Sequence, residues 1–250
     1  MINKLVILAA GKGSRLRPIT NNIPKCLTPI KTKTILGWQI DIAKKAGIEK
    51  ILVVGGYKAE KINYEGIDLI LNPIYKSSNM AESLRCALEK VNDEFILSYG
   101  DILFEEKILL DMMCLKKDIS IASDMNWLKY WSERFKNPLE DAETFKFTSD
   151  NFVSEIGKKT KDLKDIESQY IGLISFSSKG TEILKKWFSE SYKDENIFLT
   201  DMLNEMAQSG IKIYPHKINN GWLEIDNLKD LEIAKKRIFI NSVGDLKIRR

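Results

Sequence analysis

Residues 5–26 read LVILAAGKGSRLRPITNNIPKC, a hydrophobic run that leads directly into a loop of glycines and cations. Residues 4–10 are apolar almost throughout, which predicts a strand in the middle of a parallel sheet with both faces buried. In the loop that follows, two glycines allow backbone N–H groups to approach an anion, and Lys12, Arg15 and Arg17 add three positive charges. This segment is therefore predicted to hold phosphate groups at the end of a strand.

Two common phosphate-binding motifs do not fit this loop. Leu16 stands where the dinucleotide-binding fingerprint has its third glycine, and the loop lacks the Gly-Lys-Ser/Thr ending of a Walker A loop. The glycines alone also leave open a simple strand-to-helix turn with solvated basic residues. Residues further along the chain favour phosphate binding over that turn.

The rest of the chain alternates between hydrophobic runs and segments with helical spacing, and Gly47 is predicted to end the first helix in a left-handed conformation. Strands are predicted at 50–54, 69–71, 94–98, 119–122 and 222–226, β-like pieces at 145–147 and 170–176, and helices at 35–46, 80–91, 108–116, 181–192, 199–208 and 228–240. This order predicts an α/β fold with an open, mostly parallel, Rossmann-like sheet flanked by helices. No linker rich in Ser, Pro or Gly divides the chain, so we expect a single domain over residues 1–250.

The composition excludes several classes of function. The 250 residues carry a net charge of +4, which is too mild and dispersed to argue for nucleic acid. A single histidine, His216, excludes multi-histidine metal sites and every histidine-dependent triad not built on it. Three cysteines without a C-x-x-C pattern suit reduced thiols in the cytoplasm, and the first hydrophobic run is too short to span a membrane.

The run LAAGKGSRLRPITNNIPKCLTPI (residues 8–30) resembles the signature of the nucleotidyltransferases that activate sugar 1-phosphates and phosphocholine, G-x-G-[ST]-R-x-x-P followed by P-K. The resemblance extends to Gly100-Asp101 and to WLEID at 222–226, and so spans nearly the whole chain. It implies a GT-A-like nucleotidyltransferase fold with a small acceptor-binding flap. In this family the loop matching Gly11–Arg15 wraps a nucleoside triphosphate, and the lysine matching Lys25 contacts phosphates.

The chemistry gives an independent reason to assign Lys25 and Arg15 as catalytic residues. A nucleoside triphosphate and a phosphomonoester bring about six negative charges into one cleft. Each like-charge contact at 4 Å costs about 4 kcal/mol at an effective dielectric constant near 20, so cations must offset the repulsion. A phosphomonoester is already ionised at pH 7, so the reaction needs no general base.

The resemblance implies that Asp101 and Asp226 hold Mg²⁺, an ion that prefers hard oxygen ligands. Asp101 follows a predicted strand at the sheet edge where open α/β sheets bind ligands, and Asp226 ends the late strand. Two simpler roles stay open. Asp101 fits a turn residue, and Asp226 fits the N-cap of the 228–240 helix.

The resemblance places the nucleotide at the first loop and at two later segments. The residues predicted to bind it are Ala10, Gly11, Gly13, Ser14, Tyr57, Asn79 and Ser83. Asn79 is equally suited to cap the helix that follows it. The choice of CTP over UTP or GTP comes from overall similarity to the phosphocholine type.

The acceptor is predicted to bind to the flap. The residues proposed for it are Asp124, Trp127, Trp131, Arg134, Glu143 and Lys158. Trp127 and Trp131 share one face of a helix, and aromatic rings with a nearby carboxylate can bind an ammonium group. Packing under a flap is the alternative for both tryptophans, and an ordinary exposed lysine is the alternative for Lys158. Gln169, where many relatives carry an acidic residue, favours an acceptor with both charged and amide groups.

We therefore predict a Mg²⁺-dependent cytidylyltransferase that joins CTP to a small phosphorylated amine or amino-acid derivative and releases pyrophosphate. The resemblance points to phosphoglutamine or phosphocholine as acceptor and to surface polysaccharide modification as the purpose. A sugar-1-phosphate nucleotidyltransferase and a non-catalytic nucleotide-binding subunit are the alternatives. Residues 1–123 would form the nucleotide-binding core, 124–226 the acceptor-binding part and 227–250 a closing helix and tail. No oligomeric state follows from these residues.

Overall fold

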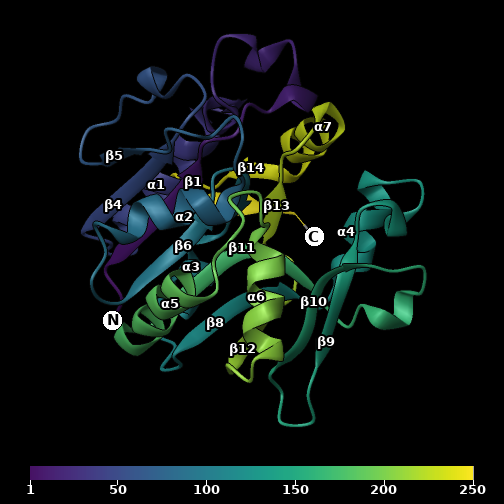
Figure 1. Cartoon of the computed structure of the whole chain (residues 1–250). Helices are drawn as coiled ribbons and strands as arrows, with labels where there is room; N and C mark the ends of the chain where they lie inside the picture. Colours follow the sequence, from purple (N-terminus) through teal and green to yellow (C-terminus); the bar gives the residue numbers. More distant parts are fainter. Residues whose placement is uncertain (250) are drawn as a thin grey trace.

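The computed structural model describes residues 1–249, which form a central seven-stranded sheet flanked by helices (Figure 1). The strand order is β12-β8-β11-β6-β1-β4-β5, and only β11 runs antiparallel to its neighbours. These strands are β1 Lys4–Ala9, β4 Lys50–Gly55, β5 Asp68–Leu71, β6 Phe95–Tyr99, β8 Ile119–Asp124, β11 Gln169–Phe176 and β12 Ile213–Ile218. The predicted open, mostly parallel α/β sheet is confirmed.

Helices cover both faces of the sheet. Successive residues of β1 point toward opposite faces, so they pack against different helices. Leu5 and Ile7 pack in one hydrophobic core, whereas Val6 and Leu8 pack in the other. The first core contains residues of α1 Ile35–Lys45, α3 Glu106–Met113, α4 Trp127–Arg134 and α7 Leu228–Arg237. The second contains residues of α2 Met80–Leu88, α5 Ser178–Glu190 and α6 Leu199–Gln208. Burial on both sides explains why β1 is hydrophobic along its whole length.

Several short strands lie outside the central sheet. β9 Glu143–Phe147 pairs with β10 Val153–Lys159, β7 Ile102–Phe104 with β13 Trp222–Glu224, β14 Ile238–Ile240 with β15 Leu246–Ile248, and β2 Pro29–Ile30 with β3 Lys33–Thr34. Figure 1 shows α4, β9 and β10 on the side of the molecule away from β4 and β5. Residues 124–226 also contribute β11 and β12 to the central sheet, so the predicted division at residue 123 stays a prediction.

The structure corrects two predicted boundaries near the end of the chain. The predicted helix 228–240 ends at Arg237, and residues 238–240 form β14 instead. The run Ile-Phe-Ile suits a strand, and pairing with residues 246–248 stabilises it there. The predicted strand 222–226 ends at Glu224, so Asp226 lies in the turn before α7. By contrast, the predicted end of the first helix is confirmed, with Gly47 at φ +89°.

Within residues 1–249, no helix has the length and hydrophobicity needed to cross a membrane.

Candidate active site

A pocket of about 340 Å³ opens where β1 and β6 end. Its walls come from the loop after β1, the turn after β6, residues 72–83 and the end of β13. The predicted site residues that line it are Ala10, Gly11, Gly13, Ser14, Arg15, Lys25, Asn79, Ser83, Asp101 and Asp226. The structure therefore brings together the predicted catalytic residues, the predicted metal ligands and six of the seven predicted nucleotide-binding residues.

Two glycines shape this pocket by leaving out a side chain. Gly13 has a left-handed backbone, with φ +63°, and a Cβ added to it would lie 2.8 Å from the Cβ of Lys25. Gly100 lies against β1, where an added Cβ would be 2.6 Å from the carbonyl oxygen of Leu8. The first glycine lets the loop pack against Lys25, and the second lets the turn that carries Asp101 pack against the end of β1.

Lys25 lies at the centre of a group of charges on the pocket floor. Its Nζ donates to Asp101 Oδ2 at 2.6 Å and to Asp226 Oδ1 at 2.5 Å. Burial alone would lower the pKa of Lys25, but the charges of Asp101, Asp226 and Glu224 together raise it above its usual value. Lys25 is thus a permanent cation. Arg15 forms an ion pair with Asp226 from the other side, with an exposed side chain.

Three carboxylates, Asp101, Glu224 and Asp226, each present an oxygen within 4.8 Å of the other two. Asp101 Oδ1 is buried and, within residues 1–249, has no hydrogen-bond partner, so it is available as a ligand. Burial would raise the pKa of Asp226, but Lys25 and Arg15 hold it below its usual value, and burial raises the pKa of Glu224 to about 7. An oxygen donor set of this kind fits a divalent cation.

Glu224 was missed by the sequence analysis, although it stands two residues before Asp226. Alternate residues of an extended segment point to the same face, so the spacing of Glu and Asp in WLEID could have revealed it. Asp226 does not cap α7, because Asn227 takes that role and accepts hydrogen bonds from the backbone N–H groups of Lys229 and Asp230. Asp226 therefore keeps its carboxylate in the pocket.

Residues 72–83 bring amide and hydroxyl groups to the pocket. Asn72, directly after β5, is buried and donates to Ser78 Oγ at 3.1 Å and to Ser83 Oγ at 3.0 Å. Asn72 was not among the residues predicted to bind the nucleotide, although a polar residue at the carboxyl end of a strand indicates a possible ligand contact. Asn79 lines the pocket and also accepts a hydrogen bond from the backbone of Met80 at the start of α2. Both of its predicted roles are compatible with this position.

Comparison with known proteins places this pocket in a family. The description "MobA-like NTP transferase domain" matches residues 5–134, just over half of the chain. The chain belongs to this nucleotidyltransferase family. Enzymatic transfer of a nucleotidyl group is therefore its activity, and the alternative of a non-catalytic subunit is not supported.

Two curated relatives of this nucleotidyltransferase and one solved structure define the similarity further. CTP:phosphoglutamine cytidylyltransferase of Campylobacter jejuni is 34% identical over 247 residues, which cover 91% of this chain and 97% of the relative. Choline-phosphate cytidylyltransferase of Streptococcus pneumoniae is 34% identical over 113 residues, 44% of this chain and 49% of that protein. The inositol-1-phosphate CTP transferase of T. maritima superposes with a TM-score of 0.76 at 22% identity, covering 94% of this chain and 96% of that one, which shows the shared fold.

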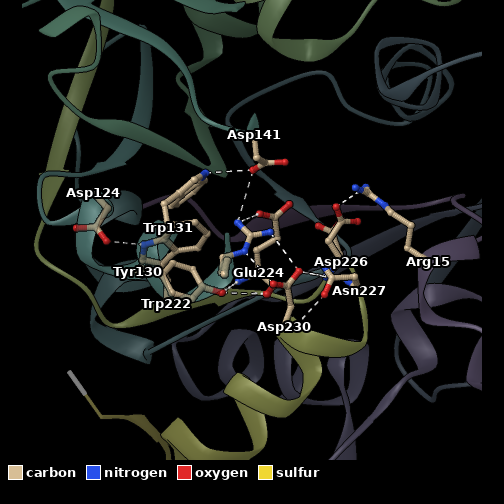
Figure 2. A network of polar contacts seen from close by, with 12 residues as sticks. Arg15, Asp124, Tyr130, Trp131, Asp141, Trp222, Glu224, Asp226, Asn227 and Asp230 are labelled. Atoms are coloured by element: carbon tan, nitrogen blue, oxygen red, sulfur yellow. Dashed lines mark hydrogen bonds and ion pairs between the residues drawn. The ribbon is translucent and has the colours of Figure 1, made fainter. Parts of the chain in front are cut away.

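Three of the predicted acceptor-binding residues of this nucleotidyltransferase lie in its interior. Trp127 and Trp131 are each only 4% exposed, with ring centroids 6.0 Å apart. The carboxylate of Asp124 is fully engaged, accepting from the backbone of Asn126 and Asn220 and from the indole of Trp222 at 2.9 Å. Figure 2 shows Trp131 and Trp222 on the side of Glu224 that faces away from Arg15. The structure therefore places these side chains in the packed interior, which is the alternative that the sequence left open for both tryptophans.

Arg134, which was predicted to contact an acceptor, is also buried. The side chain is 0% exposed, and its guanidinium lies 4.9 Å from the ring centroid of Trp131 and 5.4 Å from that of Tyr130. Nη1 lies 2.6 Å from Glu224 Oε2, and Nε donates to Asp230 Oδ1 at 3.0 Å. A group enclosed in this way is not open to a substrate.

The remaining predicted residues lie outside the pocket. Tyr57 donates its hydroxyl to the carbonyl of Asn21 at 2.9 Å and does not line the cavity. Lys158 is half-exposed and forms an ion pair with Glu155. Glu143 lies opposite Lys159 in the β9–β10 register. Acceptor contacts by Glu143 and Lys158 stay a prediction.

Glu143 provides a pH-dependent test of this region. Burial raises its pKa to about 7, with Lys159 acting in the opposite direction. The folded protein then keeps a proton that the unfolded chain loses near pH 4.5, so stability falls as the pH rises from 4.5 to 7 and is level above that. Relative to wild type, Glu143→Gln is expected to gain up to about 3 kcal/mol in unfolding free energy between pH 4.5 and pH 8. Urea denaturation of both proteins at each pH checks this, and a gain that does not depend on pH would contradict it.

Proposed function

We propose that this nucleotidyltransferase joins CTP to a small phosphorylated amino-acid derivative of the phosphoglutamine type, with Mg²⁺, and releases pyrophosphate. The product would serve surface polysaccharide modification. The choice of acceptor rests on the position of Arg134. Its guanidinium lies over the rings of Tyr130 and Trp131, where an ammonium group would otherwise bind. An acceptor with amide and carboxylate groups does not need such a cluster, whereas choline does.

The reaction follows from the pocket as an in-line displacement. A phosphate oxygen of the acceptor attacks the α-phosphorus of CTP, a new P–O bond forms, and the bond to the β-phosphate breaks to release pyrophosphate. Lys25 and Arg15 offset the charge that accumulates on the α-phosphate. The loop Gly11–Arg15 presents backbone N–H groups to the remaining phosphates. The attacking phosphate is ionised at neutral pH, so none of these residues has to remove a proton.

Asp101, Glu224 and Asp226 would hold the Mg²⁺ ion, given their distances and the free oxygen of Asp101. When bound, the ion supplies positive charge to the phosphates. Arg15 contacts Asp226, so the first loop and the carboxylates act at the same point of the pocket.

Nucleotide selection is proposed for the amide and hydroxyl end of the pocket. Asn72 donates to the oxygens of Ser78 and Ser83, which leaves the hydroxyl hydrogens of both serines free to donate. Cytosine presents O2 and N3 as acceptors, which such hydroxyls can meet. CTP is supported by the names of both curated relatives, one of which matches 91% of this chain.

The similarity also favours phosphoglutamine over phosphocholine. A match over 91% of the chain has to include most of residues 124–226, the part proposed to bind the acceptor, whereas the choline-phosphate relative matches 44%. We retain the division into a nucleotide-binding core at 1–123 and an acceptor-binding part at 124–226 as part of the proposal. Cys26, Cys86 and Cys114 are free thiols, as expected for the cytoplasmic setting that we propose.

A substrate panel tests this proposal. Phosphoglutamine, phosphocholine and several hexose 1-phosphates are each combined with CTP, UTP or GTP and Mg²⁺, and pyrophosphate release is measured. We expect kcat/KM for CTP with phosphoglutamine to exceed that for phosphocholine by at least about tenfold, the value of a single specific contact. Turnover of hexose 1-phosphates without phosphoglutamine would instead establish the sugar-1-phosphate alternative.

A further inference from the structure

We infer that Arg134 is a positioning residue, which fixes the carboxylates of the active site from behind without contacting a substrate. The inference rests on nucleotidyl transfer and on the cation proposed for Asp101, Glu224 and Asp226. Arg134 ends α4, whereas Glu224 ends β13, 90 residues later in the chain. The burial of all its polar atoms requires partners within the protein.

The first partner is Glu224. Arg134 Nη1 lies 2.6 Å from Glu224 Oε2, closer than Nε lies to Asp230 Oδ1 at 3.0 Å. The guanidinium is planar and rigid, and it is held between Trp131 at 4.9 Å and Phe135 at 5.0 Å. Its orientation is therefore fixed by packing, and it holds Glu224 by charge, since Nη1 forms no hydrogen bond within residues 1–249.

The second partner is Asp230, on the first turn of α7. Nε donates to Asp230 Oδ1 at 3.0 Å and Nη2 donates to Oδ2 at 3.2 Å, a two-point contact. Asp230 Oδ2 also accepts from the backbone N–H of Asp226 at 3.1 Å and of Asn227 at 3.2 Å. Asp230 therefore links Arg134 to the backbone of the turn that carries Asp226.

The guanidinium of Arg134 thus acts on two of the three carboxylates. It pairs directly with the side chain of Glu224, and through Asp230 it holds the backbone of Asp226. Figure 2 shows Glu224, Asp226 and Asp230 close together, with Trp131 and Trp222 on one side and Arg15 on the other. Residues that orient metal ligands in this way typically change metal affinity or activity by about 10–100-fold when they are replaced. A purely structural ion pair would change stability alone.

The test measures Mn²⁺ binding by electron paramagnetic resonance of the free ion, without CTP or acceptor. Arg134→Lys keeps the charge but cannot contact Asp230 at two points and Glu224 at the same time. We expect its Mn²⁺ dissociation constant to rise by about 10–100-fold and its kcat to fall by a similar factor. The KM for CTP is expected to change by less than about threefold, because the positioned groups act at the reacting phosphate.

Arg237→Lys is the matched control. Arg237 also joins α7 to α4, through Glu133, and is mostly buried, but it does not contact Glu224 or Asp230. We expect its Mn²⁺ affinity and kcat to stay within about twofold of wild type. Equal losses of Mn²⁺ affinity and kcat in Arg134→Lys and Arg237→Lys would mean that both arginines act only through helix packing. That result would overturn the proposal.

A double variant separates positioning from folding. Arg134→Met alone takes the arginine charge away from the buried Asp230 and from the partly exposed Glu224, so it is expected to melt at a lower temperature than wild type. Adding Asp230→Asn removes one of these charges and keeps an oxygen for the backbone of the turn, so it is expected to restore melting temperature without restoring Mn²⁺ affinity. Recovery of both would overturn the positioning role. Absence of Mn²⁺ binding in wild type would overturn the metal assignment together with this role, whereas the acceptor proposal is tested by the substrate panel alone.

Discussion

Lys25→Met is expected to lower kcat by about 10³-fold, the scale reported for loss of a charged group that stabilises a phosphoryl-transfer transition state. Lys25 is the only lysine that lines the pocket formed by the described residues, and it contacts both Asp101 and Asp226. Methionine keeps most of the volume and removes the charge. The repulsion between the nucleotide and the acceptor phosphate then loses its main counter-charge. Steady-state pyrophosphate release measures the effect, and circular dichroism confirms that the variant is folded.

Lys61→Met is the matched control for this substitution. Lys61 also belongs to a short 3-10 helix, but it is exposed and does not line the pocket. Its replacement is expected to change kcat by less than about twofold, as for ordinary surface positions. If Lys25→Met also retained more than a tenth of wild-type turnover, the catalytic role of Lys25 would be refuted.

Asp226→Asn is expected to lower kcat by about 10²–10³-fold, because a metal bound at such a site contributes several kcal/mol to the transition state. Asp226 contacts both Lys25 and Arg15, so its loss weakens the metal site and disturbs two cations at once. The Mg²⁺ concentration for half-maximal rate is expected to rise at least about tenfold. Titration of turnover with Mg²⁺ measures both quantities.

The control for Asp226→Asn is Asp245→Asn. Asp245 is also an aspartate paired with a lysine, Lys45, but it belongs to the hairpin near the end of the chain and is absent from the pocket. Its replacement is expected to leave the Mg²⁺ dependence within about twofold of wild type. An unchanged Mg²⁺ dependence in Asp226→Asn would show that Asp226 is not a metal ligand.

Most of the fold could be predicted from the sequence because its strands and helices carry strong periodic patterns. Residues 5–9 are hydrophobic on both faces, and Gly47 marks the end of α1. The boundaries near residues 226 and 238 were less predictable. Whether residues 238–240 extend a helix or form a strand depends on a partner, residues 246–248, that local preference does not reveal.

The pocket was predictable where side chains follow strands and glycines. Residues 11–15, Lys25 and Asp101 lie in such places, and the structure brings them together. The part proposed to bind the acceptor was less predictable. An arginine beside aromatic residues shows the same local sequence pattern whether its side chain binds a substrate or pairs with an internal carboxylate. The contacts of Arg134 with Glu224 and with Asp230, 90 and 96 residues away in the chain, distinguish the two cases.

The strand order of the sheet has a consequence for how such enzymes change substrate. The chain passes from β1 outward through β4 to β5, then returns to the opposite side of β1 to form β6. The loop after β1 and the turn after β6 therefore lie side by side and line the same pocket. Recognition can therefore diverge by substitution along its walls while the position of the reaction is inherited. The solved structure with a TM-score of 0.76 shares this fold at 22% identity.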